Sequence, residues 1–155
     1  MPSRPTCVLI AVCCFATIAS AQQTPPPKSV RPENLARHWV LINSSVEAAV
    51  PLRGKNMNVP GCAAVTFVVE RNGRTSNVRV QKVDPPGDLA QVAASAAASL
   101  EFEPTMSNAG RDRVFSSLIF PFNLPADPDA RTAVMERCVI EPVHWNHPEA
   151  RPPGG

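Results

Sequence analysis

The fold is set most clearly by GCAAVTFVVERNGRTSNVRV, residues Gly61–Val80, which contains two strand patterns around one tight turn. Within Ala63–Glu70 every second position is apolar, which is the period of a strand with one buried face. Asn72-Gly73 follows, and this pair favours a two-residue hairpin turn because both residues tolerate positive φ. Thr75–Val83 again alternates apolar and polar residues. The stretch therefore predicts an antiparallel hairpin with one buried face and one wet face.

A helix and a third strand are expected after this hairpin. Asp88 is expected to cap the helix, with Gln91 as the second half of a capping box, and apolar residues at helical spacing continue to Leu100. The pattern of residues 113–124 then predicts a strand, and Pro121 favours an edge position because proline has no N–H for a ladder. The order predicts an α+β fold. We expect a small three-stranded antiparallel sheet covered on one face by the helix, as a two-layer sandwich.

The N-terminal part of the chain has a different composition. Residues 1–21 have a basic start, an apolar run and the small-residue site Ala19-Ser20-Ala21, which together predict a secretory signal peptide cleaved after Ala21. The apolar run is shorter than the ~20 residues that a spanning helix needs, so no stable membrane span is expected after cleavage. Residues 22–32 are rich in proline and are expected to form an extended, disordered leader.

The remaining boundaries follow from similar patterns. Residues 33–124 are expected to form one domain resembling a two-layer sandwich. Within it, residues 33–49 fit either a strand, which HWVLI favours, or a helix, which SSVEAAV favours. Residues 125–155 are expected to form a C-terminal extension. It would contain a short helix from about Asp129 to Cys138, followed by an irregular tail.

Two cysteines, Cys62 and Cys138, remain after removal of the predicted signal peptide. An even pair in a secreted chain predicts a disulfide. A reactive or metal-binding thiol pair is the alternative, although the spacing matches no compact metal motif. Closing a loop of this length would stabilise the fold by ~4 kcal/mol through the entropy of the unfolded chain.

Little in the chain indicates catalysis or a cofactor. A net charge of +2 over 155 residues differs from the basic surface of a nucleic-acid-binding protein. The motifs of serine hydrolases, zinc proteases and phosphate loops do not occur. His144 and His147 lie near Cys138 and are a conceivable metal site, but Pro148 follows at once and the segment has no helical regularity. We therefore expect no enzyme activity, no cofactor and no bound metal.

An ordered set of features from Pro51 to Leu124 resembles a known family. In chain order these features are Gly61 before the first strand, Asn72-Gly73 at the turn, VRVQKV in the second strand, LEFEP at residues 100–104, Gly110, and a strand that closes on Phe122-x-Leu124. In their order and spacing, they resemble the C-terminal domain of TonB, the periplasmic energy transducer of Gram-negative bacteria.

The resemblance implies a binding function. The family domain adds a short extended peptide of an outer-membrane receptor to a free sheet edge, where main-chain hydrogen bonds supply the affinity. Here it places that edge on the third strand, with Phe115, Ser117 and Ile119 on the wetter face. The expected partner-binding residues are Arg113, Val114, Phe115, Ser116, Ser117, Leu118 and Ile119. The partners would be extended segments of outer-membrane or periplasmic proteins, and the hairpin would be the scaffold of the site.

Two other functions stay open beside a stand-alone periplasmic module. If the segment before Gln22 is kept as an anchor, the chain would be a membrane-anchored component of TonB-dependent transport. A structural envelope protein that pairs with itself through the free edge, as a homodimer, is the other possibility. The cleavable character of residues 1–21 favours the periplasmic module.

Overall fold

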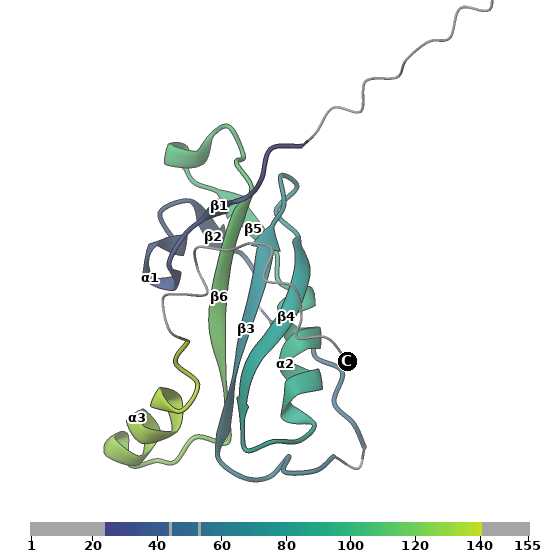
Figure 1. Ribbon diagram of the computed structural model, residues 1–155, viewed down its shortest axis with the longest axis vertical. Helices are drawn as coiled ribbons and strands as arrows, with labels where there is room; N and C mark the ends of the chain where they lie inside the picture. Colours follow the sequence, from purple (N-terminus) through teal and green to yellow (C-terminus); the bar gives the residue numbers. More distant parts are fainter. Residues whose placement is uncertain (1–23, 44, 53, 141–155) are drawn as a thin grey trace, which may run out of the picture.

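The computed structural model describes residues 24–43, 45–52 and 54–140. The elements are, in chain order, β1 (Lys28–Ser29), α1 (Pro32–Leu35), β2 (Trp39–Leu41), β3 (Gly61–Val69), β4 (Thr75–Asp84), α2 (Leu89–Ala98), β5 (Phe102–Pro104), the 3₁₀ helix η1 (Met106–Asn108), β6 (Val114–Phe122) and α3 (Pro128–Glu136). The main sheet has the order β1-β6-β3-β4, and β2 and β5 form a second, two-stranded sheet (Figure 1). The predicted α+β class is confirmed.

The predicted signal peptide and the His144/His147 segment lie outside the described residues. Over the parts of the chain that the structure covers, no helix has both the length and the apolar character needed to cross a membrane.

The predicted hairpin is present as β3 and β4, which pair antiparallel. Its turn requires Gly73, whose φ of 82° lies in the left-handed region. The Gly73 carbonyl accepts a hydrogen bond from the Phe102 N–H at 2.8 Å. A Cβ at position 73 would collide with the Phe102 carbonyl oxygen. The turn therefore closes the hairpin and also holds β5 against it.

Helix α2 packs on one face of the sheet, called the first face below, through small side chains. Ala93 and Ala97 are fully buried and form one cluster with Ala63 and Val65 of β3. Because these four side chains are short or branched close to the backbone, the helix approaches the sheet closely. The expected helical cover of this face is confirmed.

The capping box predicted at the start of α2 is wrong. Asp88 has helical φ and ψ values of −75° and −5°, and its side chain makes no capping hydrogen bond. Its carboxylate instead accepts the Lys55 N–H at 2.6 Å. A short carboxylate can bond either the helix N-terminus or a nearby loop, and here the loop before β3 takes it.

The sheet has a fourth strand, β1, so the prediction of a free leader is wrong for residues 28–30. β1 pairs parallel with β6. The Lys28 N–H donates to the Arg113 carbonyl at 2.8 Å, and the Val30 N–H donates to the Phe115 carbonyl at 2.9 Å. Val30 is only 6% exposed, and burial of its side chain holds the leader on the sheet. Over this stretch β6 lies between β3 and β1, and it is not the free edge strand that was expected.

In the segment that the sequence left open between helix and strand, residues 45–50 of SSVEAAV form no helix, and the only helix nearby in the described residues is α1, which ends at Leu35. The strand expected from HWVLI is β2, which pairs antiparallel with β5. Trp39 in β2 is 1% exposed and donates its indole N–H to the Asp112 carbonyl at 3.1 Å. The buried residues of its cluster are Val30, Leu35, Trp39, Phe67, Val69, Leu100, Phe102 and Val114. This cluster joins the small sheet to the main one.

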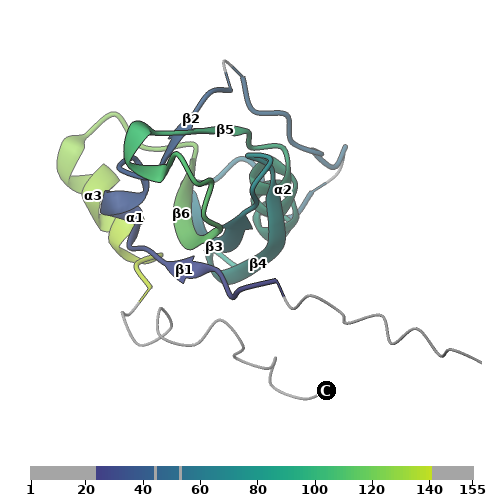
Figure 2. The same ribbon diagram turned by 90° about the horizontal axis from the view of Figure 1, so that it is seen from above.

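The opposite, second face of the sheet is covered along β3. The prediction that this face of the hairpin is exposed to solvent is therefore wrong for β3. All nine residues of β3 are buried. At one end the cover is α3, whose Val134 packs in one cluster with Cys62, Ala64 and Cys138. This is the helix predicted for the C-terminal extension. Figure 2 shows α3 on the side of the molecule away from α2.

Candidate functional site

The main chain of β6 has two sides, and one side is only half paired. The Arg113 and Phe115 carbonyls point toward β1, since they accept its N–H groups. In a regular strand the main-chain groups of alternate residues point to the same side, and the β3–β6 register has no shift. The N–H and C=O groups of Ser117 and Ile119 therefore point away from β3. β1 has ended by then, and these groups have no main-chain partner within the described ranges.

Pro121 limits the length of this unpaired stretch. It lies two residues beyond Ile119, on the same outward side of β6, and it has no N–H to offer. Proline is tolerated there because the bonds between β6 and β3 do not need that N–H. The unpaired edge is therefore short and runs from Ser117 to Ile119.

Four of the seven predicted partner-binding residues are already engaged within the chain. Val114 is fully buried in the core. Arg113 and Phe115 accept the hydrogen bonds from β1. Ser116 is also buried, and its hydroxyl donates to the Val30 carbonyl at 2.9 Å. This half of the predicted surface is thus occupied by the leader.

The other three, Ser117 to Ile119, form one wall of a pocket of about 400 Å³. The lining residues are Arg31, Pro32, Glu33, Ser117, Leu118, Ile119, Val139 and Ile140. Ser117 is only 3% exposed, and Ile119 packs against the α3 cluster. The prediction that these two side chains lie on the more solvent-exposed face of the strand is therefore wrong. No sequence signal marks residues 31–33 and 139–140 as neighbours, because they come from opposite ends of the chain.

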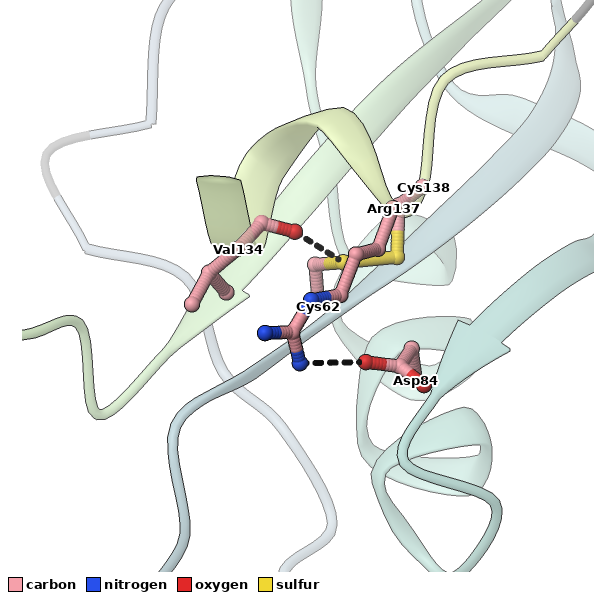
Figure 3. Close-up of a disulfide and its surroundings, with 5 residues drawn as sticks. All are labelled: Cys62, Asp84, Val134, Arg137 and Cys138. Carbon is pink, nitrogen blue, oxygen red and sulfur yellow. Dashed lines mark hydrogen bonds and ion pairs between the residues drawn. A yellow bond between two sulfur atoms is a disulfide. The ribbon is translucent and has the colours of Figure 1, made fainter. Parts of the chain in front are cut away.

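A disulfide between Cys62 and Cys138 holds the C-terminal wall of the pocket on the sheet (Figure 3). Their Cα atoms are 6.0 Å apart, and the pair is the one expected from the cysteine count. Beside it, the Arg137 guanidinium donates to the Asp84 carboxylate at 3.1 Å. The Val134 carbonyl oxygen lies 3.1 Å from Cys62 Sγ, which carries no proton in the disulfide. The two residues after Cys138 are thereby kept beside β6.

An ion pair lies at the other end of β6. Arg113 donates two hydrogen bonds to Glu70, from Nε to Oε2 at 2.6 Å and from Nη2 to Oε1 at 2.8 Å. The Ser76 hydroxyl also donates to Glu70. The hydrogen bond from Arg113 is the main cause that holds the pKa of Glu70 below its ordinary value, and its counterpart raises the pKa of Arg113. Arg113 Nη1 also donates to the Pro25 carbonyl at 3.3 Å, so the pair helps to fasten the leader.

Glu70→Gln is expected to lower the free energy of unfolding by about 1–2 kcal/mol at neutral pH, because a partly buried, charge-assisted pair is lost. Folding lowers the Glu70 pKa from 4.5. The stabilisation is therefore complete above that value and is lost as the pH falls through the folded-state pKa. Urea unfolding at a series of pH values should show the difference between wild type and variant shrinking from about pH 5 downward.

Glu101→Gln is the matched control for this measurement. The Glu101–Arg74 pair is 3.3 Å apart and both side chains are well exposed, so its removal should change stability little. A Glu70→Gln effect that stays constant from neutral to acid pH would contradict the assigned role of the carboxylate.

The groups around the pocket can form hydrogen bonds and apolar contacts. The outward groups of Ser117 and Ile119 are main-chain donors and acceptors, and much of the lining is aliphatic. Within residues 24–43, 45–52 and 54–140, no three His, Cys, Asp or Glu side chains gather as potential metal ligands. The arrangement suits the binding of another polypeptide segment.

Known proteins resemble the middle of the chain. Residues 49–124 match the family described as Gram-negative bacterial TonB protein C-terminal. The solution NMR structure of the Pseudomonas aeruginosa TonB CTD is similar at 18% sequence identity, over 58% of this chain and 90% of that chain, with a TM-score of 0.40. A search of curated proteins gave no match. The family match contains β3, β4, α2, β5 and β6, whereas β1, α1, β2 and α3 lie outside it.

Proposed function

We propose that the chain is a non-enzymatic periplasmic binding module of the TonB C-terminal type, on the premise that residues 49–124 match that family. In TonB this domain is periplasmic and interacts with outer-membrane proteins. The chain would dock extended segments of outer-membrane or periplasmic proteins by adding them as a strand to β6. The observation that carries the proposal is the unpaired outward main chain of Ser117 and Ile119 within the described ranges.

The short edge sets the expected strength of this binding. Ser117 and Ile119 offer one N–H and one C=O each, and a hydrogen bond contributes about 0.5–1.5 kcal/mol net. Their sum, about 4 kcal/mol, corresponds to a Kd of about 1 mM at the tightest, because association also costs translational and rotational freedom. Tighter binding requires side-chain contacts beside the edge or displacement of β1.

Ser117→Pro is expected to abolish capture of outer-membrane proteins when the tagged chain is mixed with a Gram-negative envelope extract. The substitution removes one outward N–H, while Pro121 is a precedent for proline on this side of β6. Capture is measured by quantitative mass spectrometry of the retained proteins.

Ser117→Ala is the matched control, because it keeps the N–H and should retain the same proteins as wild type. Circular dichroism and the urea midpoint establish that both variants are folded. Undiminished capture by folded Ser117→Pro would eliminate β6 as the binding edge.

The two rival functions are separated by simple measurements. A mature N-terminus at Gln22, found by sequencing the protein from the envelope fraction, supports the free module, whereas a retained Met1 supports the anchored transport component. Light scattering of the purified chain that gives the mass of a dimer, with the dimer lost in Ser117→Pro, would instead assign the edge to self-association.

A further inference from the structure

The pocket beside Ser117–Ile119 lies where a strand added to β6 would place a side chain. We propose that this pocket is a subsite that selects one uncharged aliphatic residue, of leucine or isoleucine size, in the docked peptide. The inference rests on the proposed function and deepens it, because it names the kind of segment that binds.

The pocket has walls on both faces of the sheet. Residues 31–33 belong to the start of α1, whose Leu35 packs in one cluster with Phe67. Phe67 is on the same face of β3 as Ala63 and Val65, which is the face that α2 covers. Ile140 packs with Ile119 in the second-face cluster under α3. A strand directs successive side chains to opposite faces of its sheet. A peptide bonded to Ser117 and Ile119 would therefore lie between these walls, and its side chain on the second face would contact Ile119 and Ile140.

The lining selects against charge. Ile119 and Ile140 are partly buried aliphatic side chains, and Val139 remains 52% exposed at the rim. The charged lining residues Arg31 and Glu33 are of opposite sign and both are well exposed, with Arg31 Nη1 4.0 Å from Glu33 Oε1, so together they give the pocket no net charge. A charged peptide side chain would lose hydration here without gaining a free counter-charge, whereas an aliphatic one would bury apolar surface. The volume of about 400 Å³ is that of a small ligand pocket.

The occupant is an extended segment of a partner because this edge already accepts one strand. β1 pairs with the first half of β6, and the chain then turns into α1 after Val30. The pocket begins at Ser117, the next residue whose main chain points outward, so it continues the same hydrogen-bonding edge. Arg31–Glu33 and Val139–Ile140 lie outside the residues matched by the family. The subsite is therefore built by segments that flank the family domain in this chain.

The test is an NMR titration of the full chain with three blocked hexapeptides, Ac-Thr-Thr-Xaa-Thr-Thr-Thr-NH₂, in which Xaa is leucine, alanine or aspartate. The amide signals of Ser117 and Ile119 report strand addition, and the methyl signals of Ile140 report entry into the pocket. The leucine peptide is expected to bind at least about tenfold more tightly than the alanine peptide. The aspartate peptide should bind more weakly than either.

Val139→Asp is expected to reduce the preference for leucine over alanine to about twofold or less, because it places a carboxylate at the rim of an apolar site. Met106→Asp is the matched control. Met106 is 99% exposed on η1 and does not line the pocket, so this variant should keep the full preference.

The possible outcomes separate the subsite from the proposed function. Equal affinities for the leucine and alanine peptides, with shifts at Ser117 and Ile119, would overturn the subsite and leave strand addition standing. Absence of shifts at both residues with every peptide would overturn both proposals. Nuclear Overhauser contacts from residues 141–155 to the methyl groups of Ile119 and Ile140 in the peptide-free chain would assign the pocket to the chain's own tail, which also overturns the subsite.

Discussion

Replacing both Cys62 and Cys138 by alanine is expected to lower the free energy of unfolding by about 4 kcal/mol. The disulfide closes a loop of 76 residues, and opening it restores the conformational freedom of that loop in the unfolded chain. Both side chains are fully buried, so the small alanine side chains also leave the α3 cluster less well packed. Urea unfolding of wild type and double variant under oxidising conditions measures the difference.

Reductant supplies the internal control for this experiment. Wild type should lose most of its advantage when unfolded in the presence of dithiothreitol, whereas the double variant should not respond. A loss below about 1 kcal/mol in the double variant would mean that the unfolded chain is already compact around this loop. It would also remove the argument that the bridge holds the pocket wall.

Trp39→Ala is expected to cost about 3–5 kcal/mol, the range for removing a large aromatic side chain from a packed core. Trp39 is 1% exposed and joins the cluster between the two sheets, and its indole N–H donates to the Asp112 carbonyl. The substitution leaves a cavity and removes one of two hydrogen bonds that the Asp112 carbonyl accepts, the other coming from the Asn108 side-chain amide at 3.4 Å. Thermal or urea unfolding monitored by far-ultraviolet circular dichroism reports the loss.

Two further variants show which part of this effect belongs to which contact. Trp39→Phe keeps an aromatic ring but lacks the N–H, so it should lose less than half as much stability as Trp39→Ala. Leu52→Ala removes an aliphatic side chain that is fully exposed, and it should leave stability unchanged. A Trp39→Ala protein as stable as wild type would show that β2 and β5 are not coupled to the main sheet.

The elements that depend on local pattern were predictable from the sequence. The alternation in β3 and β4, the Asn72-Gly73 turn and the helical spacing of α2 each contain their own signal within a few residues. The strand β6 was predictable for the same reason. The resemblance then gave the correct order of these elements, because the family's markers also lie inside this middle part of the chain.

The features that were missed depend on contacts between distant segments. β1 is two residues long, which is too short to show a hydrophobic period. It forms because the adjacent Val30 side chain is buried in the core. The capping box failed because a loop N–H takes the Asp88 carboxylate. One end of the second face is covered because the bond to Cys138 holds α3 on the sheet. The nearly continuous apolar run of β3 is typical of a strand buried on both faces, but it does not tell which distant segment provides the cover.

In the candidate site too, the part with a local sequence pattern was predictable and the part formed by distant segments was not. Ser117–Ile119 was within the predicted surface, since the strand and its Pro121 could be recognised locally. The contacts of Arg113–Ser116 with the leader could not be predicted from the sequence. The pocket could not be predicted either. Its walls come from residues 31–33 and 139–140, which are neighbours only in the folded chain.

The disulfide also decides how this molecule would respond to a mechanical pull on its N-terminal side. Every element from β3 to α3 lies between the two linked cysteines or ends next to them, whereas β1, α1 and β2 precede the closed loop. Tension would therefore peel away only the segments ahead of Cys62. The contour length of the loop, which is at most about 3.3–3.6 Å per residue, would stay unreleased as long as the sulfur–sulfur bond is intact.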